Sequence, residues 1–181
     1  MRQAKKEIYD RNIIIGLLNT CHVGRLGTNG RDGYPMVKPL NFAYEEGRIY
    51  FHSAKAGEKI DDISRDSRVC FEVDLPIALV KTRSIPCTAE YLYRSVILKG
   101  RARVVEDDSE RQQGLRLLMK KYQPEGGYTD FPEDKLKIAA VVRIDIEEMV
   151  GKEDLGKEEL KAVALKALEE KAVLPIVLER G

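Results

Sequence analysis

The chain has 181 residues, of which 43% are hydrophobic and 34% are charged, which is enough apolar material for one well-formed core and a small appendage. It carries 31 Lys and Arg against 30 Asp and Glu, so its net charge of +1 provides no basic field for nucleic acid or for an anionic membrane. We therefore expect a small molecule or another protein as its partner.

Cysteine and histidine are scarce. Cys21, Cys70 and Cys87 form no CxxC pair, and with only two histidines in the chain a zinc site is hard to assemble, so we expect no metal. This cysteine usage suits a reduced cytoplasm. The apolar run IIIGLL (13–18) is too short to span a bilayer and no cleavage signal follows it, so the sequence predicts neither a membrane anchor nor a targeting segment.

The first 44 residues predict a helix followed by two strands. The helix lies within residues 5–19, and a short strand at 21–28 ends at NGRDG, whose Asn, Asp and Gly residues favour a hairpin turn. The next strand spans residues 34–44 but contains Pro35 and Pro39, which cannot donate to a sheet ladder. Part of this strand is therefore expected at a sheet edge or an opening.

The middle of the chain predicts two more strands with a helix between them. The segment RIYFHS (48–53) has strand character, and AGEKIDDISRDS reads as a short helix with Ile60 and Ile63 facing inward. Residues 69–74 predict another strand. Residues 75–90 show no sustained period and contain two prolines, so we expect an ordered loop there.

The remaining segments alternate strand and helix patterns. Residues 91–105 predict a strand with a bulge at Gly100, residues 107–122 a helix, residues 139–152 the last strand, and residues 153–172 a charged amphipathic helix. Short strands joined by hairpin-type turns, with helices at intervals, favour an α+β, mainly β, antiparallel barrel over a parallel sheet. Neither GxGxxG nor GxxxxGK[ST] is present, so the sequence supports neither a Rossmann fold nor a P-loop.

The stretch HSAKAGEK (52–59) joins a strand end to a helix start. Ser53 offers a hydroxyl, Gly57 allows close approach of the backbone, and Lys59 places a positive charge near the first turn of the helix, all of which suit a phosphate. A solvated turn that only caps the helix explains the same residues, and a histidine at a strand end, such as His52, is often simply packed.

Four segments in order carry a family resemblance: GRLGT, GYPMVKPLNFAYEEGRIYFHSAKAGEK, RVCFEVD and YRSVILKGRARVVED. Together they resemble the pyridoxamine 5′-phosphate oxidase-like split barrels, and most closely the nitroimidazole-resistance (NimA-related) group. The resemblance covers residues 24–151. It implies an antiparallel split β-barrel with flanking helices over residues 1–151, and leaves 152–181 as a C-terminal helix and tail that pack on the barrel or on a dimer partner.

The resemblance also implies FMN bound at a homodimer interface, with FAD as the alternative. In this family a strand backbone lies along the flavin ring, a histidine and a serine lie at the ring edge and the phosphate, a lysine binds the phosphate, and the second subunit contributes an Arg-Ser pair. The cofactor-binding positions implied for this chain are Val37, Lys38, Pro39, Leu40, Asn41, His52, Ser53, Lys59, Arg94 and Ser95. His52 is the implied catalytic residue.

The sequence departs from true pyridoxamine phosphate oxidases at two places. Glu58 stands where their loop has an arginine, and their C-terminal tryptophan has no counterpart in a chain without Trp. We therefore expect an FMN-dependent reductase of a small electrophile, with nitroimidazole-type compounds as the family-level expectation and NAD(P)H or another reductant as electron donor. The alternatives are a flavin carrier or sensor without turnover, and a split barrel that binds haem through a histidine.

Overall fold

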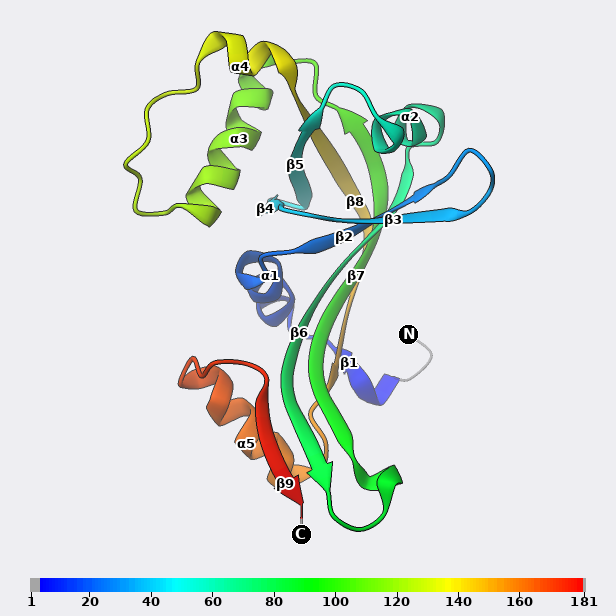
Figure 1. Ribbon diagram of the computed structural model, residues 1–181, viewed down its shortest axis with the longest axis vertical. Coiled ribbons are helices and arrows are strands. Elements are labelled where there is room, and N and C mark those ends of the chain that lie inside the picture. Colours follow the sequence, from blue (N-terminus) through cyan, green and yellow to red (C-terminus); the bar gives the residue numbers. More distant parts are fainter. Residues whose placement is uncertain (1–3, 181) are drawn as a thin grey trace. The chain divides into compact units, whose positions relative to one another are not determined.

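The computed structural model describes residues 4–180, which form a nine-stranded, mainly antiparallel sheet flanked by helices (Figure 1). The strands are β1 (Glu7–Ile8), β2 (Gly24–Asn29), β3 (Pro35–Leu40), β4 (Ala43–Glu45), β5 (Arg48–Ala54), β6 (Arg68–Thr82), β7 (Glu90–Val104), β8 (Ala139–Asp154) and β9 (Ile176–Arg180). The helices are α1 (Arg11–Thr20), α2 (Glu58–Arg65), α3 (Asp108–Tyr122), α4 (Glu133–Ile138) and α5 (Glu158–Glu169). The expected split barrel with flanking helices is thereby confirmed.

The strand order is β3-β2-β6-β7-β8-β5-β4, with β1 added to β8 and β9 added to β6. The residues cluster in two compact units. The barrel unit contains Leu18–Val73 and Ile97–Met149, and the terminal unit contains the chain up to Leu17, Asp74–Val96 and the chain from Val150 onward. Strands β6, β7 and β8 each contribute residues to both units.

The core of the barrel unit forms because alternate residues of each strand are apolar. Leu26, Ile49, Phe51 and Phe71 are fully or almost fully buried, and they come from β2, β5 and β6. The amphipathic helix α2 adds Ile60 and Ile63, which are buried as the sequence predicts.

The core of the terminal unit is an apolar cluster made by strands and one helix. Its buried members are Ile77, Ala78, Val80, Leu92, Leu155 and Ala164. Helix α5 supplies Ala164, and partly buried leucines of the same helix pack against the cluster. Strand β9 pairs in parallel with β6, with Ala78 opposite Ile176.

Several expected boundaries are corrected by the structure. The predicted loop at 75–90 is wrong, because β6 continues through Pro76 to Thr82 and a short 3₁₀ turn follows at Pro86–Thr88. The predicted strand at 34–44 is divided into β3 and β4. Strand β8 extends to Asp154, and β9 was not predicted.

Two glycines of the barrel unit have a clear structural role. The turn after β2 is a hairpin in which Gly33 has φ 88°, as its NGRDG sequence predicts. A Cβ at Gly100 would lie 2.3 Å from the carbonyl oxygen of Asp145, so β7 needs glycine there for close approach to β8.

Among residues 4–180, no helix is long and apolar enough to cross a membrane.

Candidate functional site

Strand β3 ends the sheet order, so one side of its backbone has no neighbouring strand among the described residues. The Gly30 N–H donates to the Tyr34 carbonyl at 2.8 Å, which turns the backbone of Tyr34 toward β2. Because these directions alternate along a strand, Pro35, Val37 and Pro39 face the open side. Proline has no N–H, so Val37 supplies the backbone donor of this edge. The two prolines thus lie at an edge, as the sequence predicts.

The end of β3 continues into a turn held by side-chain bonds. Leu40 is half-buried and is the last residue of β3. The Asn41 side-chain amide donates to the His22 carbonyl at 3.3 Å. This bond fixes Asn41 at the end of the open edge.

Lys38 of β3 and Glu58 of α2 form an ion pair. Lys38 Nζ lies 2.5 Å from the Glu58 carboxylate, at the first residue of α2. The acidic residue at this position is therefore compensated by a lysine from the neighbouring strand. Lys59 is half-buried, and no carboxylate is paired with it in the described part of the chain.

Helix α2 is anchored by a buried carboxylate. Asp62 is 2% exposed, accepts a hydrogen bond from the Thr28 hydroxyl at 2.8 Å and pairs with Arg65 at 2.9 Å. The Arg65 bond, together with the Thr28 bond, lowers the pKa of Asp62, although burial opposes this. At the other end, the N-cap Gly57 (φ 129°) makes no side-chain cap, and its carbonyl accepts from the Ile60 N–H at 2.8 Å. The first-turn N–H groups that remain available to an anion are therefore those of Glu58 and Lys59.

His52 and Ser53 lie next to each other at the end of β5, but their side chains point to opposite faces because successive residues alternate. His52 shares its face with Tyr50, which contacts α3, and Ser53 shares its face with Phe51 in the barrel core. Both residues were assigned to one site from the sequence, although the alternation of RIYFHS already implies that their side chains point in opposite directions.

His52 lines a largely apolar cavity of about 370 Å³ between β5 and α3, which we call the His52 cavity. Its lining residues are Asn41, His52, Leu115, Leu118, Met119, Tyr122 and Phe131. The Tyr122 hydroxyl donates to the His22 carbonyl at 2.6 Å and accepts from the Phe42 N–H at 3.0 Å, which fixes that wall. No sequence motif marks the α3 residues as part of a site, although their helical spacing could have indicated a common face.

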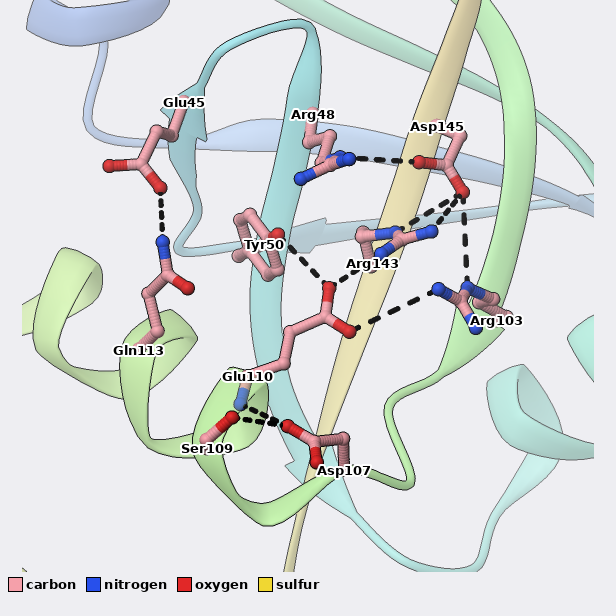
Figure 2. A network of polar contacts seen from close by, with 10 residues as sticks. All are labelled: Glu45, Arg48, Tyr50, Arg103, Asp107, Ser109, Glu110, Gln113, Arg143 and Asp145. Carbon is pink, nitrogen blue, oxygen red and sulfur yellow. Dashed lines mark hydrogen bonds and ion pairs between the residues drawn. The ribbon is translucent and has the colours of Figure 1, made fainter.

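Helix α3 is held on β5 and β8 by a polar network (Figure 2). Glu110 accepts from the Tyr50 hydroxyl at 3.1 Å and from Arg143 at 2.6 Å. Arg143 also donates to Asp145 at 2.8 Å, and Arg48 lies 3.6 Å from the same carboxylate. Since Tyr50 is 1% exposed and little of the Arg143 side chain reaches solvent, this network fixes the helix firmly.

The network also shifts the pKa values of Tyr50 and Glu110. Burial and the hydrogen bond to Glu110 raise the pKa of Tyr50. Burial opposes ionisation of Glu110, but the bonds from Arg143 and Tyr50 outweigh it and lower the pKa of this carboxyl. The Asp107 carboxylate caps the helix by accepting from the Glu110 N–H at 2.8 Å.

Lys121 lies near the end of α3, where its side chain contacts α1 and the Phe42 ring. Its ammonium donates to the Leu18 carbonyl at 2.9 Å and lies 3.5 Å from the centre of the Phe42 ring. Burial lowers the pKa of Lys121 to about 8. These contacts connect the end of α3 to the end of α1 within the barrel unit.

The remaining implied residues lie in the terminal unit. Arg94 pairs with Glu153 at 2.9 Å and has a side chain that is 14% exposed, and Ser95 is buried. Both belong to Asp74–Val96, whereas His52, Ser53 and Lys59 belong to the barrel unit. The described residues contain no cluster of His, Cys, Asp or Glu that could hold a metal ion.

The family model described as pyridoxamine 5′-phosphate oxidase matches residues 10–153. No curated protein matches the chain. Similar solved structures include a protein assigned to 5-nitroimidazole antibiotic resistance from Bacteroides thetaiotaomicron, with 25% identity, a TM-score of 0.72 and coverage of 81% of this chain and 85% of that one. The flavocytochrome Anf3 from Azotobacter vinelandii has 25% identity, a TM-score of 0.75 and coverage of 90% and 77%.

A third structure, the FAD and heme binding protein from Mycobacterium smegmatis, has 20% identity, a TM-score of 0.74 and coverage of 87% of this chain and 80% of that one. At this identity the likeness concerns the fold alone.

Proposed function

The chain belongs to the pyridoxamine 5′-phosphate oxidase family, and on this premise we propose that it binds a flavin, FMN rather than FAD, and reduces a small electrophile. The proposal is carried by the open edge of β3, together with Lys59 of α2, which no described carboxylate neutralises. A planar ring can lie along such an edge, and the free ammonium suits a phosphate. The proposed setting is the cytoplasm.

Each proposed cofactor contact has a distinct physical task. The backbone of Val37, Lys38, Pro39 and Leu40, with Asn41 at its end, would lie along the ring, where the Val37 N–H is the available donor. Lys59 would neutralise the phosphate. The Ser53 hydroxyl would donate to the same group.

A bound flavin would supply the electron-transfer chemistry, while the protein orients the ring and shapes access to it. His52 is the proposed catalytic residue, because it lines a cavity whose other walls are mainly apolar and aromatic. Such a cavity suits a small ring compound. Nitro compounds are the proposed substrates, supported by the likeness to the Bacteroides protein, and NAD(P)H or another reductant is the proposed electron donor.

The proposed assembly is a homodimer in which Arg94 and Ser95 of one subunit reach the flavin of the other. Arg94 is engaged by Glu153 within its own chain, so this contact would have to open or to share the arginine. If each site is complete only in the dimer, FMN and the subunit contact stabilise each other. Sedimentation of apo and FMN-loaded protein across a dilution series tests this: a monomer with full FMN affinity would contradict the shared site.

The phosphate contact gives the decisive test of the flavin proposal. We expect Lys59→Ala to weaken FMN binding about tenfold to 100-fold and riboflavin binding little, because the lost contact is a charge-assisted bond to phosphate. Flavin fluorescence titration measures both ligands, with Lys120→Ala, an exposed lysine of α3, as the control. Equal weakening of FMN and riboflavin would remove Lys59 from the site.

A second candidate function is haem binding, supported by the likeness to a flavocytochrome. His22 and His52 are the two histidines of the chain and therefore its two candidate histidine ligands. Absorbance separates the candidates: flavin bands support FMN, and a Soret band supports haem. Flavin that is bleached by NAD(P)H and reoxidised by a nitroaromatic supports turnover, whereas flavin that is not bleached supports a carrier or sensor.

A further inference from the structure

One face of α3 lines two cavities in succession. Arg111, Leu115, Leu118, Met119 and Tyr122 follow a spacing of i, i+4, i+7, i+8 and i+11, which places them along one stripe of a helix. The last four line the His52 cavity. Arg111 lines a second cavity at the other end of the stripe, and on the helix axis it lies about 6 Å from Leu115.

This second cavity, the Arg111 cavity, has a volume of about 240 Å³. Its lining residues are Lys55, Val104, Val105, Arg111, Ala139 and Ala140. The two charged residues among them are both cations, and the other four are apolar. Lys55 follows the last residue of β5, and His52 lies near the end of the same strand. Both cavities are therefore lined by α3 and by the end of β5.

The guanidinium of Arg111 has unused hydrogen-bonding capacity. Its side chain is 18% exposed and pairs with Asp108, itself 78% exposed, at 2.7 Å. Its Nε–H is buried, and among the described residues it has no hydrogen-bond partner. A buried donor without an acceptor is unfavourable, so an acceptor that enters the cavity would be stabilised at this position.

We propose that the Arg111 cavity binds the oxyanion group, carboxylate or phosphate, of a substrate whose ring occupies the His52 cavity. Arg111 presents several N–H donors in a fixed plane, and Lys55 adds a mobile positive charge, a combination that suits an oxyanion. Arg111 and Leu115 lie about 6 Å apart along the helix axis. At this separation, an anionic group attached directly to an aromatic ring can reach Arg111 while the ring contacts Leu115. The substrate class is therefore a small aromatic acid or phosphate ester that carries the reducible group on the opposite end of its ring.

That this ligand is a substrate rests on the proposed function, but the site itself does not require a flavin. The test therefore uses the full chain both without and with FMN, and it measures binding by calorimetry. The probes are 4-nitrobenzoate, 4-nitrophenyl phosphate and the neutral 4-nitrobenzamide. The first two carry different oxyanions on the same ring, and the third has a similar shape without charge.

We expect the unmodified protein to bind at least one of the two anions about tenfold more tightly than the amide, in the absence of FMN as well as in its presence. Arg111→Gln should abolish this preference, and Lys55→Gln should reduce it. Arg116→Gln, an equal charge change at an exposed position of the same helix, should leave it intact. The anion that gains more identifies the group as carboxylate or phosphate.

Equal binding of all three probes by the unmodified protein would overturn the proposal, and so would a preference that survives Arg111→Gln. Lys55→Gln replaces an exposed residue and keeps the test decisive if Arg111→Gln does not fold. An anion preference without any binding of FMN would contradict the proposed flavin function and still support the anion site.

Discussion

Helices α3 and α5 pack on strands in two different ways. In the barrel unit, Glu110 of α3 is held by Tyr50 and Arg143, and the same helix lines the His52 and Arg111 cavities. In the terminal unit, Ala164 of α5 is buried among Leu92 and other apolar side chains. The contact between α5 and its strands, which we call the apolar seam, mainly stabilises the fold. The Glu110 network between α3 and its strands, which we call the polar seam, fixes the helix and still leaves cavities for ligands.

The largest effect is expected where the apolar seam is broken. Leu92 is fully buried in the cluster that holds α5, so Leu92→Ala should lower the free energy of unfolding by about 3 kcal/mol through lost burial and a cavity. Urea unfolding measures this. A loss below about 1 kcal/mol would contradict the structural role given to this cluster.

Breaking the polar seam should cost less. Glu110→Gln removes the charge that Arg143 faces, but Asp145 still pairs with that arginine, so we expect a loss of about 2 kcal/mol. The control is Glu148→Gln, which alters an exposed pair with Lys99 and should change stability by less than about 0.5 kcal/mol. Equal effects of both substitutions would mean that the network contributes no more than a surface pair.

The polar seam should also be the pH-sensitive one. Because the folded-state pKa of Glu110 lies below the usual value of 4.5, its contribution is fully present above that pH and is lost as the pH falls below it. The stability difference between the unmodified protein and Glu110→Gln should thus shrink on acidification. Urea unfolding at a series of pH values measures it, and a constant difference would refute the ionised network.

The smallest effect is expected on the outer face of α5. Lys166 and Glu170 lie 3.7 Å apart with side chains 71% and 63% exposed, so Lys166→Ala should change stability by no more than about 0.5 kcal/mol. A thermal melt at low and high salt measures it. A loss comparable to that of Glu110→Gln would remove the contrast between the two helices.

The fold could be predicted where local pattern determines structure. The NGRDG hairpin, the inward isoleucines of α2 and the edge position of Pro35 and Pro39 all follow from residue type and spacing. The extension of β6 through Pro76 could not, because this segment has no strand periodicity, and pairing with β7 and with the distant β9 makes it part of the sheet.

The candidate site was predictable to a lesser degree. The sequence indicated Ser53 and Lys59 as phosphate ligands, and the resemblance added His52, but neither revealed that Lys38 compensates Glu58. Lys38 and Glu58 belong to a strand and a helix that are separated in the sequence. Whether their side chains meet depends on how the two elements pack. The engagement of Arg94 by Glu153 escaped prediction for the same reason.

The prolines of β3 have one more consequence. An edge strand with free N–H groups is a template on which another chain can add a strand and start an aggregate. On the open side of β3, Pro35 and Pro39 leave the Val37 N–H as the donor, too little for a regular ladder. The edge proposed to hold a flat ligand is therefore also protected against aggregation, even before any ligand covers it.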